Sequence, residues 1–123
     1  MNNTELEKII SDTQSNPYIK WNNSSLADWC RVDGEFSVYL FNRDGNHGYF
    51  SLLHNLTSKV DGIIVELGNR EGLGILSIYD ALQPDSKFYT LDIVNDNRFI
   101  KNEIKNDPRV NILNDFNSLD NDR

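Results

Sequence analysis

Two acidic residues stand at the ends of short apolar runs, where they could bind a nucleotide. Glu66 lies in the apolar stretch 62–67, which breaks at Gly68, and Asp92 directly follows a second stretch, 88–91. Between them, apolar residues recur at helical spacing. A β-loop-α-β nucleotide-binding unit typically has this order of elements: an apolar, β-branched strand, a loop with glycines, a helix, and a second strand that ends at an acidic residue.

The elements that must position these acids follow from the same pattern. The sequence predicts strands over 62–67, 88–91 and 110–113, separated by two helices. The first helix carries Ile75, Ile78, Tyr79 and Leu82 and stops at Pro84; the second begins at Asn95 or Asp96, carries Phe99, Ile100 and Ile104, and ends at Asp107-Pro108. The unbroken Ile63-Ile64-Val65 run predicts a parallel strand buried on both faces. Asn111 and Asn114 indicate that the third strand lies at an edge.

The first 60 residues predict a helical, aromatic-rich segment. Thr4 and Glu7 fit a capping box, which predicts a helix from about residue 5 to 13. A second helix is expected over 46–58, with His47 and His54 as packing or surface residues, because no metal-ligand spacing surrounds them. The aromatic residues between these helices fit core packing better than a lid over the nucleotide unit: Trp21, Trp29, Phe36, Tyr39 and Phe41.

Composition excludes several classes of function. A chain of 123 residues is long enough for one domain, and its net charge of -7 opposes binding to nucleic acid. No apolar stretch approaches the ~20 residues of a membrane span. The single cysteine, Cys30, permits no intrachain disulfide, and the N-terminus does not resemble a signal peptide. We therefore expect a cytoplasmic protein that does not bind membranes.

Two cofactor classes compete for the predicted unit. A dinucleotide site has the pattern G-x-G-x-x-G directly after the strand, but Arg70 stands where its second glycine should be. The observed pattern, Glu66-x-Gly68-x-x-x-Gly72, resembles motif I of the class I S-adenosylmethionine-dependent methyltransferases. Asp92, 20 residues after Gly72, has the place of the acid that accepts hydrogen bonds from both ribose hydroxyls in this family.

The resemblance covers about half the chain, roughly residues 60 to 119. Four segments, 65–72, 89–93, 96–99 and 107–110, together look like a branch of small bacterial methyltransferases, some encoded near surface-glycan genes. The chain departs from the family at Asn114, where a glycine usually precedes the acid that corresponds to Asp115.

The resemblance implies a binding role for each matching residue. Glu66 would attract the ammonium group of S-adenosylmethionine, and Asp92 would bind its ribose. Backbone amides after Gly68, from Asn69 to Gly72, would receive polar or anionic groups near a helix start. Ile93 would cover the adenine, and Asp115 would lie near its amino group. The implied activity is methyl transfer to a small-molecule or sugar-like acceptor, with no metal site and no catalytic base identified.

The family continues beyond the third strand, so the expected fold is a partial Rossmann-like α/β domain without its C-terminal strands. Residues 1–60 would form the N-terminal segment and 61–123 the front half of the cofactor-binding domain. The first strand would then lie at an open sheet edge, which predicts self-association or binding of a complementing fragment. Two alternatives remain: a non-catalytic, truncated or split cofactor-binding or interaction module, and, less favoured because of Arg70, an NAD-dependent oxidoreductase.

Overall fold

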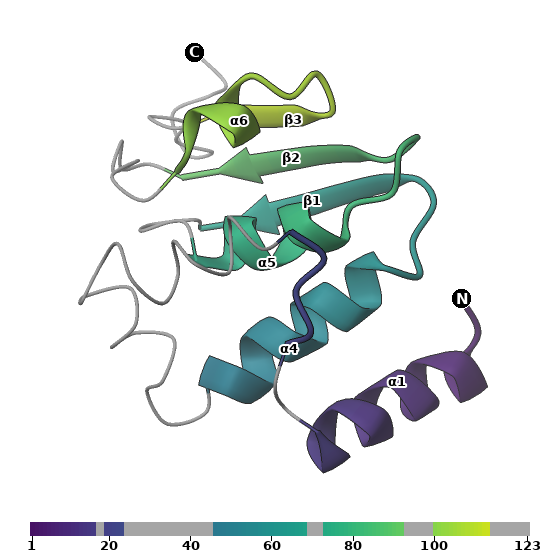
Figure 1. Ribbon diagram of the computed structural model, residues 1–123. Coiled ribbons are helices and arrows are strands. Elements are labelled where there is room, and N and C mark those ends of the chain that lie inside the picture. Colours follow the sequence, from purple (N-terminus) through teal and green to yellow (C-terminus); the bar gives the residue numbers. More distant parts are fainter. Residues whose placement is uncertain (17–18, 24–45, 69–72, 93–99, 114–123) are drawn as a thin grey trace.

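The computed structural model describes residues 1–16, 19–23, 46–68, 73–92 and 100–113 (Figure 1). These residues form an α/β fold with a parallel sheet and an N-terminal helix. The elements in chain order are α1 (Asn3–Ser15), α4 (Asn46–Thr57), β1 (Ile63–Leu67), α5 (Leu73–Ala81), β2 (Lys87–Leu91), α6 (Asn102–Lys105) and β3 (Val110–Leu113). This arrangement is compatible with the predicted partial Rossmann-like fold.

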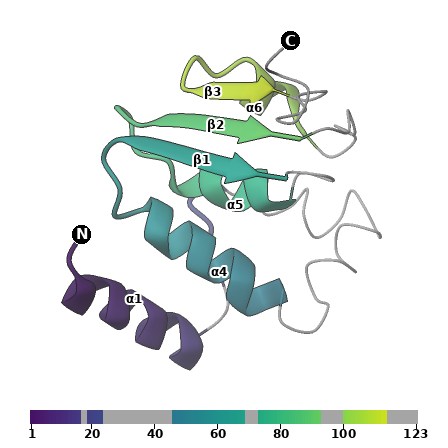
Figure 2. The same ribbon diagram turned by 180° about the vertical axis from the view of Figure 1, so that it is seen from behind.

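The three strands are parallel and lie in the order β1-β2-β3, so β3 is an edge strand of this sheet, as predicted. Val65 is the register partner of Tyr89, and Tyr89 is that of Asn111. Helices α5 and α6 lie on the same face of the sheet, as the two views in Figures 1 and 2 show. Two right-handed crossovers that step in one direction along a sheet place both helices on one face.

The hydrophobic core lies between that face and the helices. Helix α5 packs against α4, and α4 packs against α1. Leu76, which the helical pattern did not mark, is fully buried because α5 has α4 on one side and the sheet on the other. The buried core residues come from α4, α5, β2, α6, β3 and the stretches beside them: Phe50, Ile75, Leu76, Ile78, Leu82, Phe88, Ile100, Ile104 and Val110.

The prediction that β1 is buried on both faces is wrong. Ile63, Val65 and Leu67 are 69%, 57% and 80% exposed, whereas Ile64 and Glu66 are half-buried on the helix side. Within the described part of the chain the helices cover only one face of the sheet, which Figure 2 shows from the opposite side. The alternate residues of β1 therefore form an exposed apolar row.

The start of α1 also differs from its prediction. Asn2, not Thr4, is the N-cap residue, and its Oδ1 accepts a hydrogen bond of 2.9 Å from the backbone N–H of Glu5. Asparagine caps a helix at least as well as threonine, so the earlier cap extends the helix by a residue or more.

At the end of α5, Arg109 Nη1 donates to the carbonyl oxygens of Leu82 and Gln83, both at 3.1 Å.

The short stretch 19–23 packs onto the core. Trp21 contacts the core cluster, and its ring stands edge-on to that of His54 with a centroid separation of 6.1 Å. For Trp21 the packing interpretation is confirmed, while the other four aromatic residues lie outside the described residues. His54 is 6% exposed and so is a packing histidine, as predicted. The side chain of His47 and the predicted start of the second crossover helix, with Phe99, also lie outside them. The prediction that this helix carries Ile100 is wrong, because α6 begins at Asn102 with Lys101 as its N-cap residue.

Candidate functional site

Three of the predicted site residues come together at the carboxyl ends of β1 and β2. Glu66 is the fourth residue of β1, Gly68 directly follows that strand, and Asp92 directly follows β2. The N–H of Gly68 donates to the carbonyl of Leu91 at 2.7 Å, which joins the two strand ends. Gly68 has φ of +88°, a left-handed conformation that other residues adopt only with strain, so the turn that leaves β1 requires glycine here.

The carboxyl group of Glu66 points into the layer between sheet and helices. Thr90 faces the same side of the sheet at the matching register position, and its hydroxyl donates to Glu66 Oε1 at 2.7 Å. On the other side, a Cβ atom added to Gly74 would collide with Glu66 Oε2. The first turn of α5 therefore lies against the carboxyl group, and glycine makes that close approach possible.

Burial changes the protonation of this acid. Loss of solvent raises the pKa of Glu66 to about 7, the hydrogen bond from Thr90 acts in the opposite direction, and the charge of Asp92 raises the pKa further. Near neutral pH the carboxyl group therefore exists in both protonated and ionised forms. A cationic ligand group beside it would favour the ionised form.

Asp92 lies next to Glu66 on the neighbouring strand end. It is half-buried, and its backbone N–H faces the carbonyl oxygen of Leu113 at 3.4 Å. Its effect on the pKa of Glu66 shows that the two carboxyl groups are close enough to interact electrostatically. The strand ends thus bring together two acids on either side of a glycine turn.

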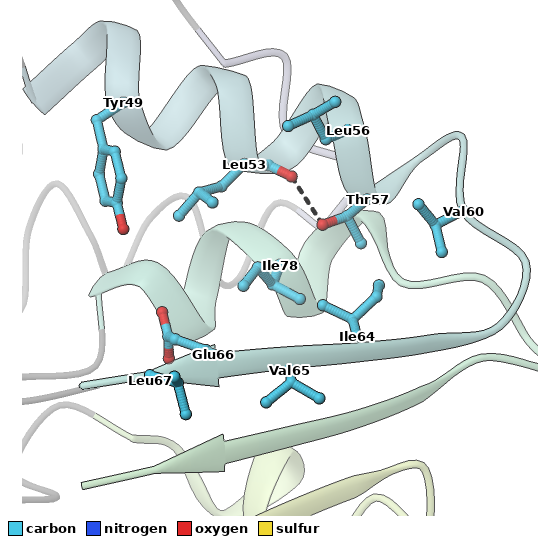
Figure 3. Close-up of a pocket in the computed structure, with 10 residues that line it drawn as sticks. All are labelled: Tyr49, Leu53, Leu56, Thr57, Val60, Ile64, Val65, Glu66, Leu67 and Ile78. Carbon is cyan, nitrogen blue, oxygen red and sulfur yellow. Dashed lines mark hydrogen bonds between the residues drawn. The ribbon is translucent and has the colours of Figure 1, made fainter. Parts of the chain in front are cut away.

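A pocket of about 290 Å³ opens beside this pair, between α4, β1 and α5 (Figure 3). Glu66 lies at one end of it, with the hydroxyl of Tyr49 on the facing helix. The Thr57 hydroxyl donates to the carbonyl of Leu53 in its own helix at 2.7 Å, so its proton is already used. The rest of the lining is apolar: Leu53, Leu56, Val60, Ile64, Val65, Leu67 and Ile78. Gly68 and Asp92 do not line this pocket, which lies beside the acid pair and not over it.

The other predicted site residues, Asn69, Gly72, Ile93 and Asp115, lie outside the described residues. Sequence reasoning missed Thr90 and Gly74, the two residues that hold the Glu66 carboxyl group. A signal for Thr90 was present, because it is a polar residue in an apolar strand two positions before Asp92.

A second buried acid, Asp80 of α5, has a structural environment. Its carboxyl group is fully buried and accepts hydrogen bonds from the backbone N–H groups of Asn22 (2.6 Å) and Asn23 (2.7 Å). His54 Nε2 lies 2.8 Å from the same carboxyl group. Because backbone N–H groups of stretch 19–23 and the His54 ring surround this acid, it fixes the stretch to α4 and α5.

The described residues contain no group of three or more histidine, cysteine, aspartate or glutamate side chains that could hold a metal ion. Their helices are all too short or too polar to cross a membrane. Comparison of the chain with protein-family models, with curated proteins and with solved structures gave no match.

Proposed function

We propose that this chain binds S-adenosylmethionine at the carboxyl ends of β1 and β2, as the cofactor-binding half of a methyltransferase. The observation that carries the proposal is the arrangement of Glu66 and Asp92 around the left-handed turn at Gly68. In open parallel sheets, ligands bind outside the carboxyl ends of the strands. The motif spacing in the sequence points to the same place.

The chemistry of the two acids suits this cofactor. S-adenosylmethionine has an ammonium group and two ribose hydroxyls, which are donors and bond well to carboxylates. Glu66, at the inner end of the site, would hold the ammonium group, and Asp92 would accept from the ribose. Two neighbouring carboxylates would repel the pyrophosphate of a dinucleotide, because like charges at short range are unfavourable where solvent is partly excluded. The two carboxylates therefore favour a cationic cofactor over NAD.

The bound cofactor supplies an electrophilic methyl group on a sulfonium sulfur. The residues of this chain would orient it for transfer to a small-molecule or sugar-like acceptor, whose nucleophilic atom must lie in line with the carbon–sulfur bond. Glu66, held in place by its half-buried position and by the close approach of α5, would bind one end of the cofactor. A cofactor-binding module without catalysis is the second candidate, because neither a catalytic base nor an acceptor-binding residue is identified in this chain.

We expect the purified chain to bind S-adenosylmethionine, or its demethylated product, more tightly than NAD. The reason is the match between two carboxylates and a cationic ligand. Isothermal titration calorimetry with the three compounds at one salt concentration measures the difference. Equal or tighter binding of NAD would contradict the proposal.

Replacing the ribose ligand should weaken binding by a defined amount. Asp92→Ala removes charge-assisted hydrogen bonds worth about 1.5 to 3 kcal/mol, or roughly a tenfold to hundredfold loss of affinity. Asp61→Ala, an exposed acid before the amino end of β1, is the charge-matched control and should bind as wild type does. If Asp92→Ala also binds as wild type, Asp92 does not hold the ribose.

A further inference from the structure

We propose that Thr90 and Gly74 are positioning residues for cofactor binding: they hold the Glu66 carboxyl group at the end of β1 so that it selects a ligand with an amino-acid end. This role rests on the proposed function, because the group that Glu66 would recognise is the ammonium group of S-adenosylmethionine. It goes further by naming the two residues on which that recognition depends.

Thr90 meets Glu66 because of the strand register. The two residues are register partners on β2 and β1, and Thr90 has no solvent exposure. Its hydroxyl donates to Glu66 Oε1 at 2.7 Å. A β-branched side chain has a restricted χ1 angle, so a buried threonine holds its hydroxyl in one place. The hydrogen bond therefore fixes one carboxyl oxygen relative to the sheet.

Gly74 lies against the other carboxyl oxygen, on the side of the helix layer. It belongs to the first turn of α5, and a Cβ atom added to it would collide with Glu66 Oε2. The oxygen that would have to move is the end of a flexible side chain. Alanine at this position should therefore displace the carboxyl group and leave α5 intact, since alanine favours a helix more than glycine does. Gly74 thus limits where the carboxyl group can lie.

The two contacts leave the carboxyl group able to bind a cation. A carboxylate has about four acceptor positions, so it can accept from Thr90 and from an ammonium group together. Burial raises the pKa of Glu66 to about 7, the hydrogen bond from Thr90 opposes that rise, and the charge of Asp92 adds to it. Thr90 therefore also favours the ionised form that an ammonium group requires. The hydroxyl of Tyr49 is the titratable group of α4 beside the pocket that Glu66 lines.

The positions of these residues divide the ligand into two parts. Thr90 and Gly74 contact the carboxyl group that would bind the amino-acid end, whereas the ribose is assigned to Asp92. Loss of either contact should weaken the binding of a ligand that carries an ammonium group. It should spare a ligand that has only the adenosine part.

Isothermal titration calorimetry on the full chain tests this division with two probes. S-adenosylhomocysteine, the demethylated cofactor, has the amino-acid end, and methylthioadenosine lacks it. Thr90→Val removes the hydroxyl at nearly constant volume and should weaken binding of the first probe by about tenfold, with the second unchanged. Gly74→Ala should give the same pattern by displacing the carboxyl group. Thr90→Ser keeps the hydroxyl and should bind both probes as wild type does.

Thr13→Val is the matched control. Thr13 is a buried threonine of α1, a helix that packs against α4, and its hydroxyl donates to the carbonyl of Ile9 at 2.8 Å. This variant should bind both probes as wild type does. Carbon NMR titration of the Glu66 carboxyl group, without ligand, follows the contact itself. Thr90→Val should raise the pKa of Glu66 above its wild-type value, and Thr90→Ser should not.

Four results would overturn the proposal. Equal weakening of both probes by Thr90→Val would mean that Thr90 acts through the fold as a whole. Wild-type affinity of Thr90→Val and Gly74→Ala for S-adenosylhomocysteine would mean that neither residue positions Glu66. Equal affinity of the wild-type chain for the two probes would show that Glu66 holds no ammonium group, while the ribose part of the proposed function would stand. Failure of the wild-type chain to bind either probe would contradict the proposed function itself, and with it the recognition of the cofactor by Glu66.

Discussion

Asp80→Ala is expected to lower the free energy of unfolding by about 3 to 5 kcal/mol, the largest effect of any single substitution considered for this chain. The Asp80 side chain has no solvent exposure and accepts from the backbone N–H groups of Asn22 and Asn23, with His54 Nε2 at 2.8 Å. Truncation leaves these three groups without their acceptor, and one of them, the His54 ring, is buried. The cost of unpaired buried polar groups therefore adds to the lost hydrogen bonds.

Urea unfolding of the variant and wild type measures this difference. Asp85→Ala, which removes an exposed acid from the turn after α5, is the control and should stay within about 0.5 kcal/mol of wild type. Hydrogen exchange should show loss of protection at the amides of Asn22 and Asn23. A loss below about 1 kcal/mol, with both amides still protected, would mean that stretch 19–23 is held by other contacts.

The sequence predicted the elements of the sheet well because their signals are local. Short runs of β-branched and aromatic residues between glycines and prolines marked β1, β2 and β3, and the same pattern placed α5 between the first two. The carboxyl ends of parallel strands lie at the same edge of a sheet. The element order therefore predicted that Glu66, Gly68 and Asp92 lie close together. No tertiary information was needed for that part of the candidate site.

The predictions that failed or were missing depend on contacts between distant residues. The run Ile63-Ile64-Val65 showed that β1 is apolar, but not that the described helices cover only one of its faces. His54 and Asp80 are 26 residues apart, and each alone resembles an ordinary polar residue on a helix. The contact between Glu66 and Thr90 depends on the strand register, which periodicity does not supply.

The titration of Glu66 should appear in the stability of the protein as a difference between wild type and Glu66→Gln. The pKa of Glu66 is raised from 4.5 to about 7, chiefly because the carboxyl group is buried. Between these two values the unfolded chain loses the proton while the folded chain retains it. The wild-type free energy of unfolding should therefore fall as the pH rises from about 4.5 to 7, by about 3 kcal/mol for this group.

Glu66→Gln removes this pH dependence because glutamine stays neutral, and its carbonyl oxygen can still accept from Thr90. The variant should gain stability relative to wild type as the pH rises toward 7, and the difference should become constant above it. Urea unfolding at a series of pH values measures the curve, with Glu7→Gln on the exposed face of α1 as the charge-matched control. A difference between Glu66→Gln and wild type that does not change across this pH range would show that Glu66 titrates alike in the folded and unfolded chain. Its carboxyl group would then lie in solvent, and the inward position beside Thr90 and Gly74, on which its proposed role in holding an ammonium group depends, would be wrong.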